Sequence, residues 1–297
     1  MTAAQQRAAA GYLSETYEVS QRKASRVLDR PRSTLRYQPR DRSAEAPLVR
    51  ALRRLARKHP RWGYRRIHAR LEKLGWTVNL KKVHRLWREL GLRRKVRRRP
   101  PNKLGSKPGT SANSCVNRPT RHKNDVWTCD FIADRTACGR TLKWLTLVDE
   151  YTRECLALHV DHSLTGADVR AVLGRVIGRR GAPRRIRSDN GSEFICEALR
   201  GWLPGKGTEP LAVAPGSPWE NGFIESFNSR FRDEFLEVEE FETVSDAREK
   251  ARWFRREFNT IRPHSSIGYQ TPQEFSDECD RGLHGQPSED GQSISDQ

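Results

Sequence analysis

The sequence of 297 residues predicts an α/β domain with a mixed five-stranded sheet and flanking helices, preceded by two small all-α units. Apolar residues recur at helical spacing through the first 92 residues, whereas strand and helix patterns alternate from residue 127 onward. Charge divides at the same place. Residues 1–126 carry 34 Lys and Arg against 8 Asp and Glu, and residues 127–297 carry 22 against 29. A basic helical part and an acidic α/β part indicate a division of labour.

The excess of positive charge in the first part predicts a polyanionic partner, with DNA or RNA as the first candidate. The acidic part is free to hold cations. No stretch approaches the roughly 18–20 apolar residues of a membrane span, and the N-terminus lacks the pattern of a secretory signal. The six cysteines form no C-x-x-C pair, which favours reduced thiols over disulfides or a zinc site. These features favour a cytoplasmic protein with no membrane partner.

Residues 1–42 predict a first unit of three short helices. Ser20 is placed to cap the second helix, in which Ala24, Val27 and Leu28 are expected to face inward. Short helices joined by tight turns, with arginines outside, are typical of a helix-turn-helix. A small helical cap without DNA contact is the alternative.

Residues 46–92 predict a second helical unit. Its third helix follows Asn79, a good N-cap residue, and buries apolar side chains that include Val83 and Leu86. Four basic residues lie at the start or on the exposed side of this helix, where a helix-turn-helix meets base edges and phosphates: Lys81, Lys82, Arg85 and Arg88. The alternative is a solvated basic face.

Residues 93–123 predict a basic, flexible linker, since Pro, Gly, Ser and Asn leave little to pack. Its basic start continues the charge of the preceding helix and could follow a DNA backbone. The candidate phosphate contacts there are Arg93, Arg94, Arg97 and Arg98.

Residues 124–275 predict the α/β domain. WTCDFIADR, TLKWLTLVDEYT and RECLALHVDH have strand character and follow one another as a meander. ADVRAVLGRVIGRRG is an amphipathic helix, RRIRSDNG and PLAVAP are further strands, and a long helix runs from about residue 219 to 236. This order indicates a mixed sheet with helices on its faces.

Three acids stand out in this part of the sequence. Asp130 lies inside an apolar strand, where an unpaired carboxylate is costly to bury. Asp189 ends a strand, at the kind of edge where open α/β sheets bind ligands, and Glu225 lies on the long helix. Three acids brought together repel one another unless a cation lies among them. Carboxylate oxygens suit Mg²⁺ or Mn²⁺, and two such ions clamp the reacting oxygens of a phosphodiester.

These residues carry a resemblance to a known family. WTCDF with Asp130, IRSDNGSEF with Asp189 and SPWENGFIESFNSRFRDEF with Glu225 resemble a DDE transposase of the bacterial insertion-sequence class, whose core is similar to retroviral integrase. Thirty-five residues separate the second acid from the third, which is the spacing of that superfamily. The blocks GYRRIHARL and HSSIGYQTPQEF extend the resemblance, which covers roughly residues 20–275.

The resemblance implies a ribonuclease H-like core with a C-terminal helical extension and two catalytic Mg²⁺ (or Mn²⁺) ions. The ions would be bound by Asp130, Asp189 and Glu225. It implies 3′-end cleavage and strand transfer on double-stranded DNA, at the ends of an insertion sequence and at its target. It also implies a homo-oligomer in the synaptic complex, a possible partner in the helix-turn-helix product of an upstream reading frame, and a cytoplasmic, nucleoid-associated location in bacteria.

Other polar residues near the motifs have competing interpretations. Glu220 rivals Glu225, but it lies about 140° away on a helical wheel, so both cannot point into one site. Asp149 and Glu150 are expected to be turn residues. Asn221 is a candidate for DNA contact beside the ions.

His264 is expected to bind DNA or to pack rather than to act as a general base. Residues 276–297 have the composition of a disordered acidic tail. Two alternative functions stay open: a metal-dependent, structure-specific nuclease on the same fold, and a catalytically inactive DNA-binding regulator. The helical units argue against the first, and the intact acid triad argues against the second.

Overall fold

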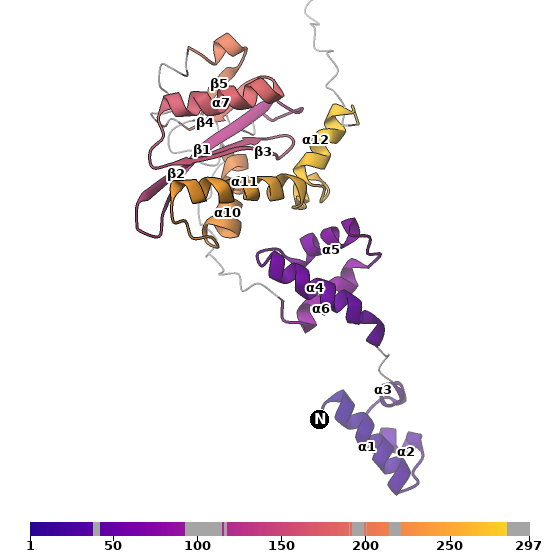
Figure 1. Ribbon diagram of the computed structural model, residues 1–297. Coiled ribbons are helices and arrows are strands. Elements are labelled where there is room, and N and C mark those ends of the chain that lie inside the picture. Colours follow the sequence, from indigo (N-terminus) through magenta and orange to yellow (C-terminus); the bar gives the residue numbers. More distant parts are fainter. Residues whose placement is uncertain are drawn as a thin grey trace, which may run out of the picture. The chain divides into compact units, whose positions relative to one another are not determined.

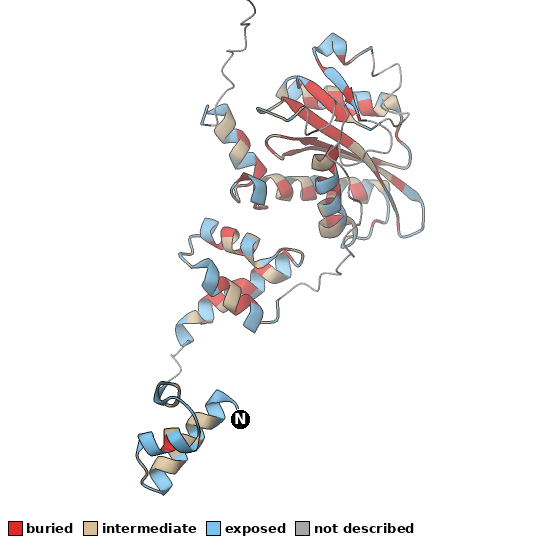
Figure 2. Ribbon diagram, turned by 180° about the vertical axis from the view of Figure 1, so that it is seen from behind, coloured by how far each residue is buried: buried red, intermediate tan, exposed pale blue. Residues whose placement is uncertain are grey.

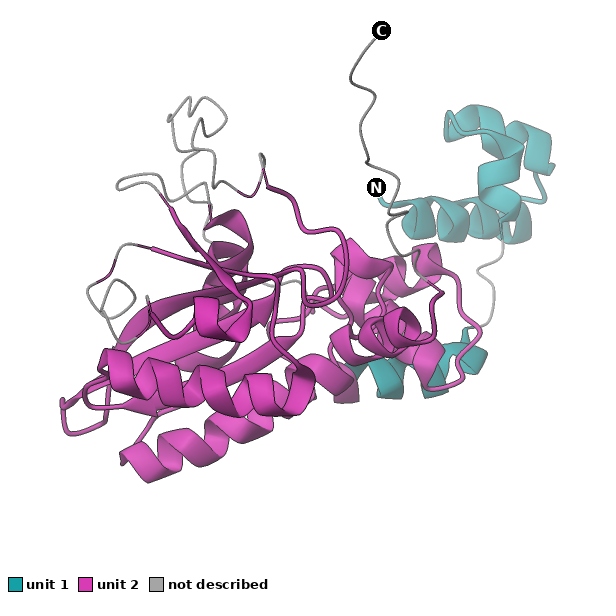
Figure 3. Cartoon of the chain, turned by 90° about the horizontal axis from the view of Figure 1, so that it is seen from above, with its two compact units in different colours: residues 1–53 teal, residues 54–297 magenta. Residues whose placement is uncertain are grey.

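The computed structural model describes most of the chain, in two compact units that comprise residues 1–53 and 54–297 (Figure 3). The described residues are 1–37, 42–92, 115, 118–189, 191, 199, 201–213 and 221–283. Most of the 93–123 segment and all of residues 284–297 therefore lie outside the described part. Among the described residues, no helix is long and apolar enough to cross a membrane.

The first unit is built from short helices. They are α1 (Ala3–Thr16), α2 (Gln21–Val27) and α3 (Arg32–Arg36), followed by a 3₁₀ turn, η1 (Ser43–Glu45), and the first part of α4 (Ala46–Lys58). Ser20 caps α2 as expected, accepting a hydrogen bond from the backbone N–H of Lys23. Ala24 is buried, but Val27 is 66% exposed, contrary to the expectation. Ala24 and Leu28 lie about 40° apart on a helical wheel and share one face of this short helix. Val27 lies about 60° from Ala24 in the other direction, and about 100° from Leu28.

The second compact unit, residues 54–297, begins with helices rich in basic residues. After the end of α4 come α5 (Tyr64–Lys73) and α6 (Leu80–Glu89). Asn79 caps α6 through its side-chain oxygen, which accepts from the Lys81 N–H at 2.7 Å. Val83, Leu86 and Trp87 are buried on its inner side. The third helix of the predicted DNA-binding unit therefore has the expected cap and the expected inner face.

A mixed five-stranded sheet forms the centre of the second unit (Figure 1). Its strands are β1 (Val126–Arg135), β2 (Thr141–Asp149), β3 (Cys155–Asp161), β4 (Arg185–Ser188) and β5 (Glu209–Ala212), in the order β3-β2-β1-β4-β5. The first three strands pair antiparallel as a meander, whereas β4 and β5 run parallel to β1. The predicted α/β fold with a mixed five-stranded sheet is confirmed.

Helices cover both faces of the sheet, and the strands between them are largely buried (Figure 2). On β2, Trp144 packs into a cluster with aromatic residues of α10 (Gly222–Phe231) and α11 (Val244–Thr260). Its neighbour Leu145 packs into a second cluster with apolar residues of α7 (Gly166–Arg180). Alternate side chains of one strand thus face two different helical layers.

The helix predicted for residues 219–236 is present, with a change of geometry. α10 begins at Gly222, and residues 214–220 lie outside the described part. From Arg232 to Leu236 the chain continues as a π-helical turn, η4. A 3₁₀ turn, η5 (Ser265–Ile267), and α12 (Pro272–Asp280) follow α11. Earlier in the chain a further 3₁₀ turn, η2 (Pro204–Lys206), leads into β5.

Candidate active site

Asp130 lies in the middle of β1 and faces α10. Its strand neighbour Cys129 packs in the cluster under α7, whereas Ile132, two residues after Asp130, packs in the cluster with α10. The Asn228 side-chain amide donates to Asp130 Oδ2 at 2.7 Å, and the Phe131 backbone N–H donates to Oδ1 at 2.8 Å. Two hydrogen bonds therefore hold this carboxylate in place.

Asp189 follows the end of β4 and is brought level with Asp130 by the strand register. β4 pairs parallel to β1 with Arg187 opposite Thr128, and Asp189 and Asp130 each come two residues later. The Gly191 N–H donates to Asp189 Oδ1 at 3.1 Å, so the turn after β4 holds this carboxylate.

Glu225 lies in the first turn of α10, three residues before Asn228. Residues three apart on a helix are neighbours, so Glu225 lies on the flank of α10 that carries the amide bound to Asp130. Burial raises the pKa of Glu225 above its ordinary value. The predicted rival, Glu220, lies outside the described residues.

The three carboxyl groups interact electrostatically. Partial burial and, to a smaller extent, the negative charges of Asp189 and Glu225 raise the pKa of Asp130 to about 6, while its two hydrogen bonds oppose the shift. Among the described residues, no salt bridge includes any of these three acids. The site is therefore a concentration of negative charge without a built-in cation.

This donor set fits a divalent metal. Carboxylate oxygens are the ligands that Mg²⁺ and Mn²⁺ prefer. A bound cation would favour the ionised form of Asp130 and so lower its raised pKa. Within the described part of the chain, however, no three His, Cys, Asp or Glu side chains are close enough to hold a metal ion. Asp189 and Glu225 raise the pKa of Asp130 electrostatically, but the three carboxylates are not close enough together to form a three-ligand site.

Two asparagines attach α10 to the strands beneath it. Asn228 also accepts a hydrogen bond from Thr146 Oγ1 at 3.0 Å, and Asn221 accepts one from Thr128 Oγ1 at 2.5 Å. Asn221 is only 7% exposed, and its side-chain oxygen accepts a hydrogen bond from strand β1. Its contact with DNA stays a prediction. Asn228 was not identified from the sequence as a residue of the site, because its bond to Asp130 depends on the packing of α10 against β1.

Asp149 and Glu150, expected in a turn, are both fully buried in ion pairs. Asp149 lies at the end of β2 and pairs with Arg180 at 3.3 Å. Glu150 pairs with Arg187, whose side chain is equally buried. Each of these acids therefore has its cation inside the protein, and removing that arginine would leave a buried charge uncompensated.

His264 packs against Phe258, with 6.4 Å between the ring centroids. Burial, together with Arg262, Arg230 and other arginines, lowers its pKa to about 3. The imidazole is therefore neutral at physiological pH and is hydrogen-bonded to Ser266 Oγ at 3.0 Å.

The predicted DNA contacts lie partly inside the described structure. Lys81, Lys82 and Arg88 are exposed on α6, and Arg85 is half-buried with its guanidinium 3.0 Å from Glu89 Oε2. The other predicted contacts lie outside the described residues: Arg93, Arg94, Arg97 and Arg98.

Family comparisons agree with this architecture. Residues 120–218 and 206–272 match two models that are each described as an integrase core domain, and residues 43–100 match an HTH-like domain. The fold and the acid-bearing core define a DDE-type polynucleotidyl transferase with a ribonuclease H-like core.

Similar proteins come from bacterial insertion elements. The chain is 38% identical over 258 residues to an uncharacterized 39.2 kDa protein of insertion element IS476 from Xanthomonas euvesicatoria, covering 87% of this chain and 72% of that protein. It is 36% identical to a 31.7 kDa protein of IS407 from Burkholderia multivorans, covering 88% of this chain and 92% of that one. The InsD transposase of IS2 from Escherichia coli is 28% identical and covers 73% of each chain. The chain belongs to the insertion-element transposases.

A solved structure with a similar core is the HTLV-2 integrase catalytic core domain in complex with magnesium. It is 13% identical to this chain, with a TM-score of 0.42, and the match covers 52% of this chain and 97% of that one.

Proposed function

We propose that this transposase performs metal-dependent 3′-end cleavage and strand transfer at the ends of an insertion sequence, with Asp130, Asp189 and Glu225 as its catalytic residues. The observation that carries the proposal is the state of Asp130. It is a partly buried acid with no arginine or lysine partner among the described residues, and its burial together with two further acids raises its pKa. Such a group is costly unless an external cation completes it.

The three carboxylates would hold two Mg²⁺ or Mn²⁺ ions. When bound, these ions supply activation of the attacking oxygen and stabilisation of the leaving oxygen. The protein's own part is to position the ligands. Asn228 orients the Asp130 carboxylate, and the Gly191 N–H fixes Asp189. Glu225 is exposed at the start of α10, where DNA has access to it.

DNA would be bound by the basic N-terminal half. Lys81, Lys82, Arg85 and Arg88 would meet the duplex along α6, and the basic segment that follows would track the backbone. Synapsis of two element ends would use a homo-oligomer, and the upstream-frame helix-turn-helix product is a candidate partner. The reaction would take place on DNA in the bacterial cytoplasm, at the nucleoid.

A strand-transfer assay with labelled element-end DNA and Mg²⁺ tests the proposal. We expect 3′-end nicking followed by joining of the labelled end to a target duplex. Products that are cut but never joined would instead support the nuclease alternative, and binding without cutting would support the inactive regulator. Asp189→Asn provides the control, because it removes a charged ligand with little change in volume.

A further inference from the structure

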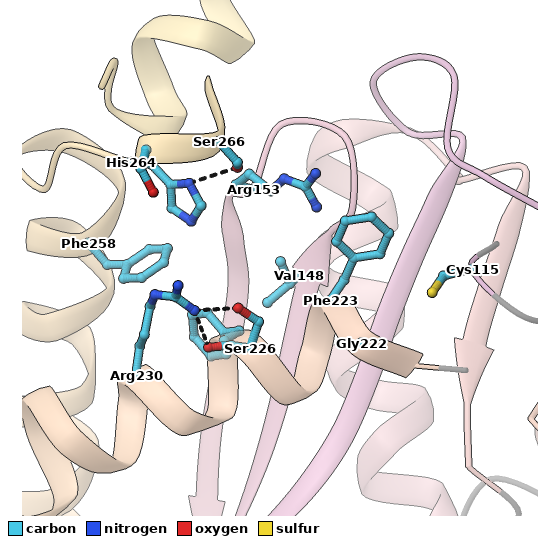
Figure 4. Close-up of a pocket in the computed structure, with 12 residues that line it drawn as sticks. Cys115, Val148, Arg153, Gly222, Phe223, Ser226, Arg230, Phe258, His264 and Ser266 are labelled. Carbon is cyan, nitrogen blue, oxygen red and sulfur yellow. Dashed lines mark hydrogen bonds between the residues drawn. The ribbon is translucent and has the colours of Figure 1, made fainter. Parts of the chain in front are cut away.

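A second polar site lies on another side of α10. A pocket of about 370 Å³ is lined by Arg153, Phe223, Arg230, Phe258 and His264, among other residues (Figure 4). Phe223, Ser226 and Arg230 project from one side of α10, three and four residues apart. Glu225 lies roughly 100° to 200° around the helix from them. The pocket is therefore separate from the candidate active site.

The pocket has an excess of positive charge. Arg153 and Arg230 both line it, and neither forms a salt bridge with a described carboxylate. The acids that act on them from further away already have other arginines: Asp149 with Arg180, Glu150 with Arg187, and Glu234 with Arg262.

Hydrogen-bonding capacity is also unused there. Arg153 Nε is buried and has no hydrogen-bond partner in the described structure. Arg230 donates through one nitrogen, Nη1, to the carbonyl and hydroxyl oxygens of Ser226. The guanidinium of Arg153 lies over the Phe223 ring, 4.1 Å from its centroid. A partly buried guanidinium that is held in place without an anion favours binding of one.

The remaining wall is apolar and aromatic. Phe223, Phe227, Phe258 and Val148 provide ring faces and aliphatic surface, and Ser265 and Ser266 add hydroxyl groups at His264. Aromatic faces next to arginines are the surfaces on which unpaired bases stack, while arginines hold the adjoining phosphates. The volume lies within the usual range for a small-ligand site, which begins near 300 Å³.

We propose that this pocket binds one nucleotide of an unpaired DNA strand, with the base against Phe223 and Phe258 and the phosphate on Arg153 and Arg230. The nucleotide must be unpaired, because a base inside a duplex is enclosed by its stack and its partner strand. The proposal rests on the proposed function for its source of DNA, and it adds a contact that positions a strand beside α10.

Photo-cross-linking of the full chain locates the nucleotide directly. The probe is a ten-nucleotide oligothymidylate that carries 5-iodouracil, with peptide mapping of the adducts. We expect adducts at Phe223, Phe258 or His264. Adducts confined to the basic N-terminal half would overturn the proposal, while leaving DNA binding by that half intact.

Affinity for the same oligonucleotide tests the charge. Arg153→Gln should weaken binding roughly tenfold or more, because a charge-assisted contact is lost. Arg153→Lys keeps the charge and should recover part of it. Arg256→Gln, on the exposed side of α11 and outside the pocket, controls for the loss of one positive charge. Equal affinities of the Gln variants at positions 153 and 256 would refute the proposal, and thermal melting checks that each variant folds.

Removing the bases tests the aromatic wall. An abasic strand of the same length should bind roughly tenfold more weakly than oligothymidylate, and Phe223→Leu should reduce that difference. Free thymidine monophosphate as competitor separates the strand from a mononucleotide. If it competes as well as the strand at equal nucleotide concentration, the ligand is a free nucleotide and the proposal is wrong. Asp189→Asn should cross-link normally, so failure of the pocket and failure of the catalytic proposal give different results.

Discussion

Two acids that pack at α10 and the turn after it, Asp130 and Glu234, differ in how their charge is compensated. Glu234, in the π-helical turn, accepts from Arg262 through both oxygens at 2.6 and 2.7 Å and from Arg66 of α5 at 2.9 Å. These contacts lower its pKa despite its burial. Asp130 has only an amide and a backbone N–H, and its pKa rises to about 6. A carboxylate completed inside the protein is structural, whereas one left incomplete indicates a cation site.

Other buried acids in the described part of the α/β domain also have arginine partners, although burial still raises the pKa values of Asp149 and Glu150. Their arginine partners come from distant parts of the sequence, in the pairs Asp125–Arg185, Asp149–Arg180, Glu150–Arg187 and Glu154–Arg180. Asp130 differs from all of them, since its neighbours in charge are two further acids. The predictions below test whether that difference marks function.

The largest effect is expected from removing the charge of a proposed metal ligand. Asp130→Asn, Asp189→Asn and Glu225→Gln should each reduce cleavage and joining on the order of a thousandfold or more, because each loses a charged oxygen ligand but little volume. Binding to element-end DNA should change little, since it depends on the basic half. Gel-based joining and equilibrium binding measure the two effects, and near-normal joining by any variant would remove that residue from the site.

Glu234→Gln should act on stability. The change leaves Arg66 and Arg262 close together without their shared anion, which we expect to lower the free energy of unfolding by about 3–5 kcal/mol. Glu237→Gln is the matched control, because Glu237 is mostly exposed and lies 3.5 Å from Arg61, where a surface pair contributes less than about 1 kcal/mol. Denaturant melts of both variants decide it, and equal losses would contradict the structural role of Glu234.

Asp130→Asn should have the opposite effect on stability when no divalent metal is present. Because the pKa of Asp130 in the folded state, about 6, exceeds its ordinary value of 3.8, ionisation destabilises the folded state progressively between these pH values and fully above them. At about 1.4 kcal/mol per pH unit, the wild type loses up to about 3 kcal/mol relative to the variant at pH 7. Melting in EDTA from pH 4 to 8 measures the gap.

Magnesium supplies the control for that experiment. Added Mg²⁺ should raise the melting temperature of the wild type above pH 6 and have less effect on Asp130→Asn, because binding to the folded state stabilises it. A gap between the two proteins that does not change with pH would assign the effect to packing rather than to ionisation.

Most of the fold could be predicted from the sequence because its signals are local. The meander of β1 to β3, the amphipathic α7 and the acids at Asp130 and Asp189 follow from strand patterns and turn residues in short windows. What could not be predicted depends on distant partners. Asp149 resembles a turn residue until Arg180 is placed beside it, and Glu234 is one charge among many until Arg66, 168 residues away, approaches it. Asn228 likewise gains its importance only when α10 lies on β1.

The last prediction carries the comparison to the DNA-binding helix. Arg85 is paired with Glu89 on α6, whereas Arg88 is exposed and forms no ion pair with a described residue. If an uncompensated charge marks function here too, Arg88→Ala should weaken binding to element ends roughly tenfold more than binding to random duplex, because a base contact is lost. Arg85→Ala should have a smaller effect, since its guanidinium must first leave Glu89. Competition binding of each variant against both duplexes measures this. A uniform loss on both DNAs would make α6 a backbone clamp and move the search for the base-reading element to residues 20–37.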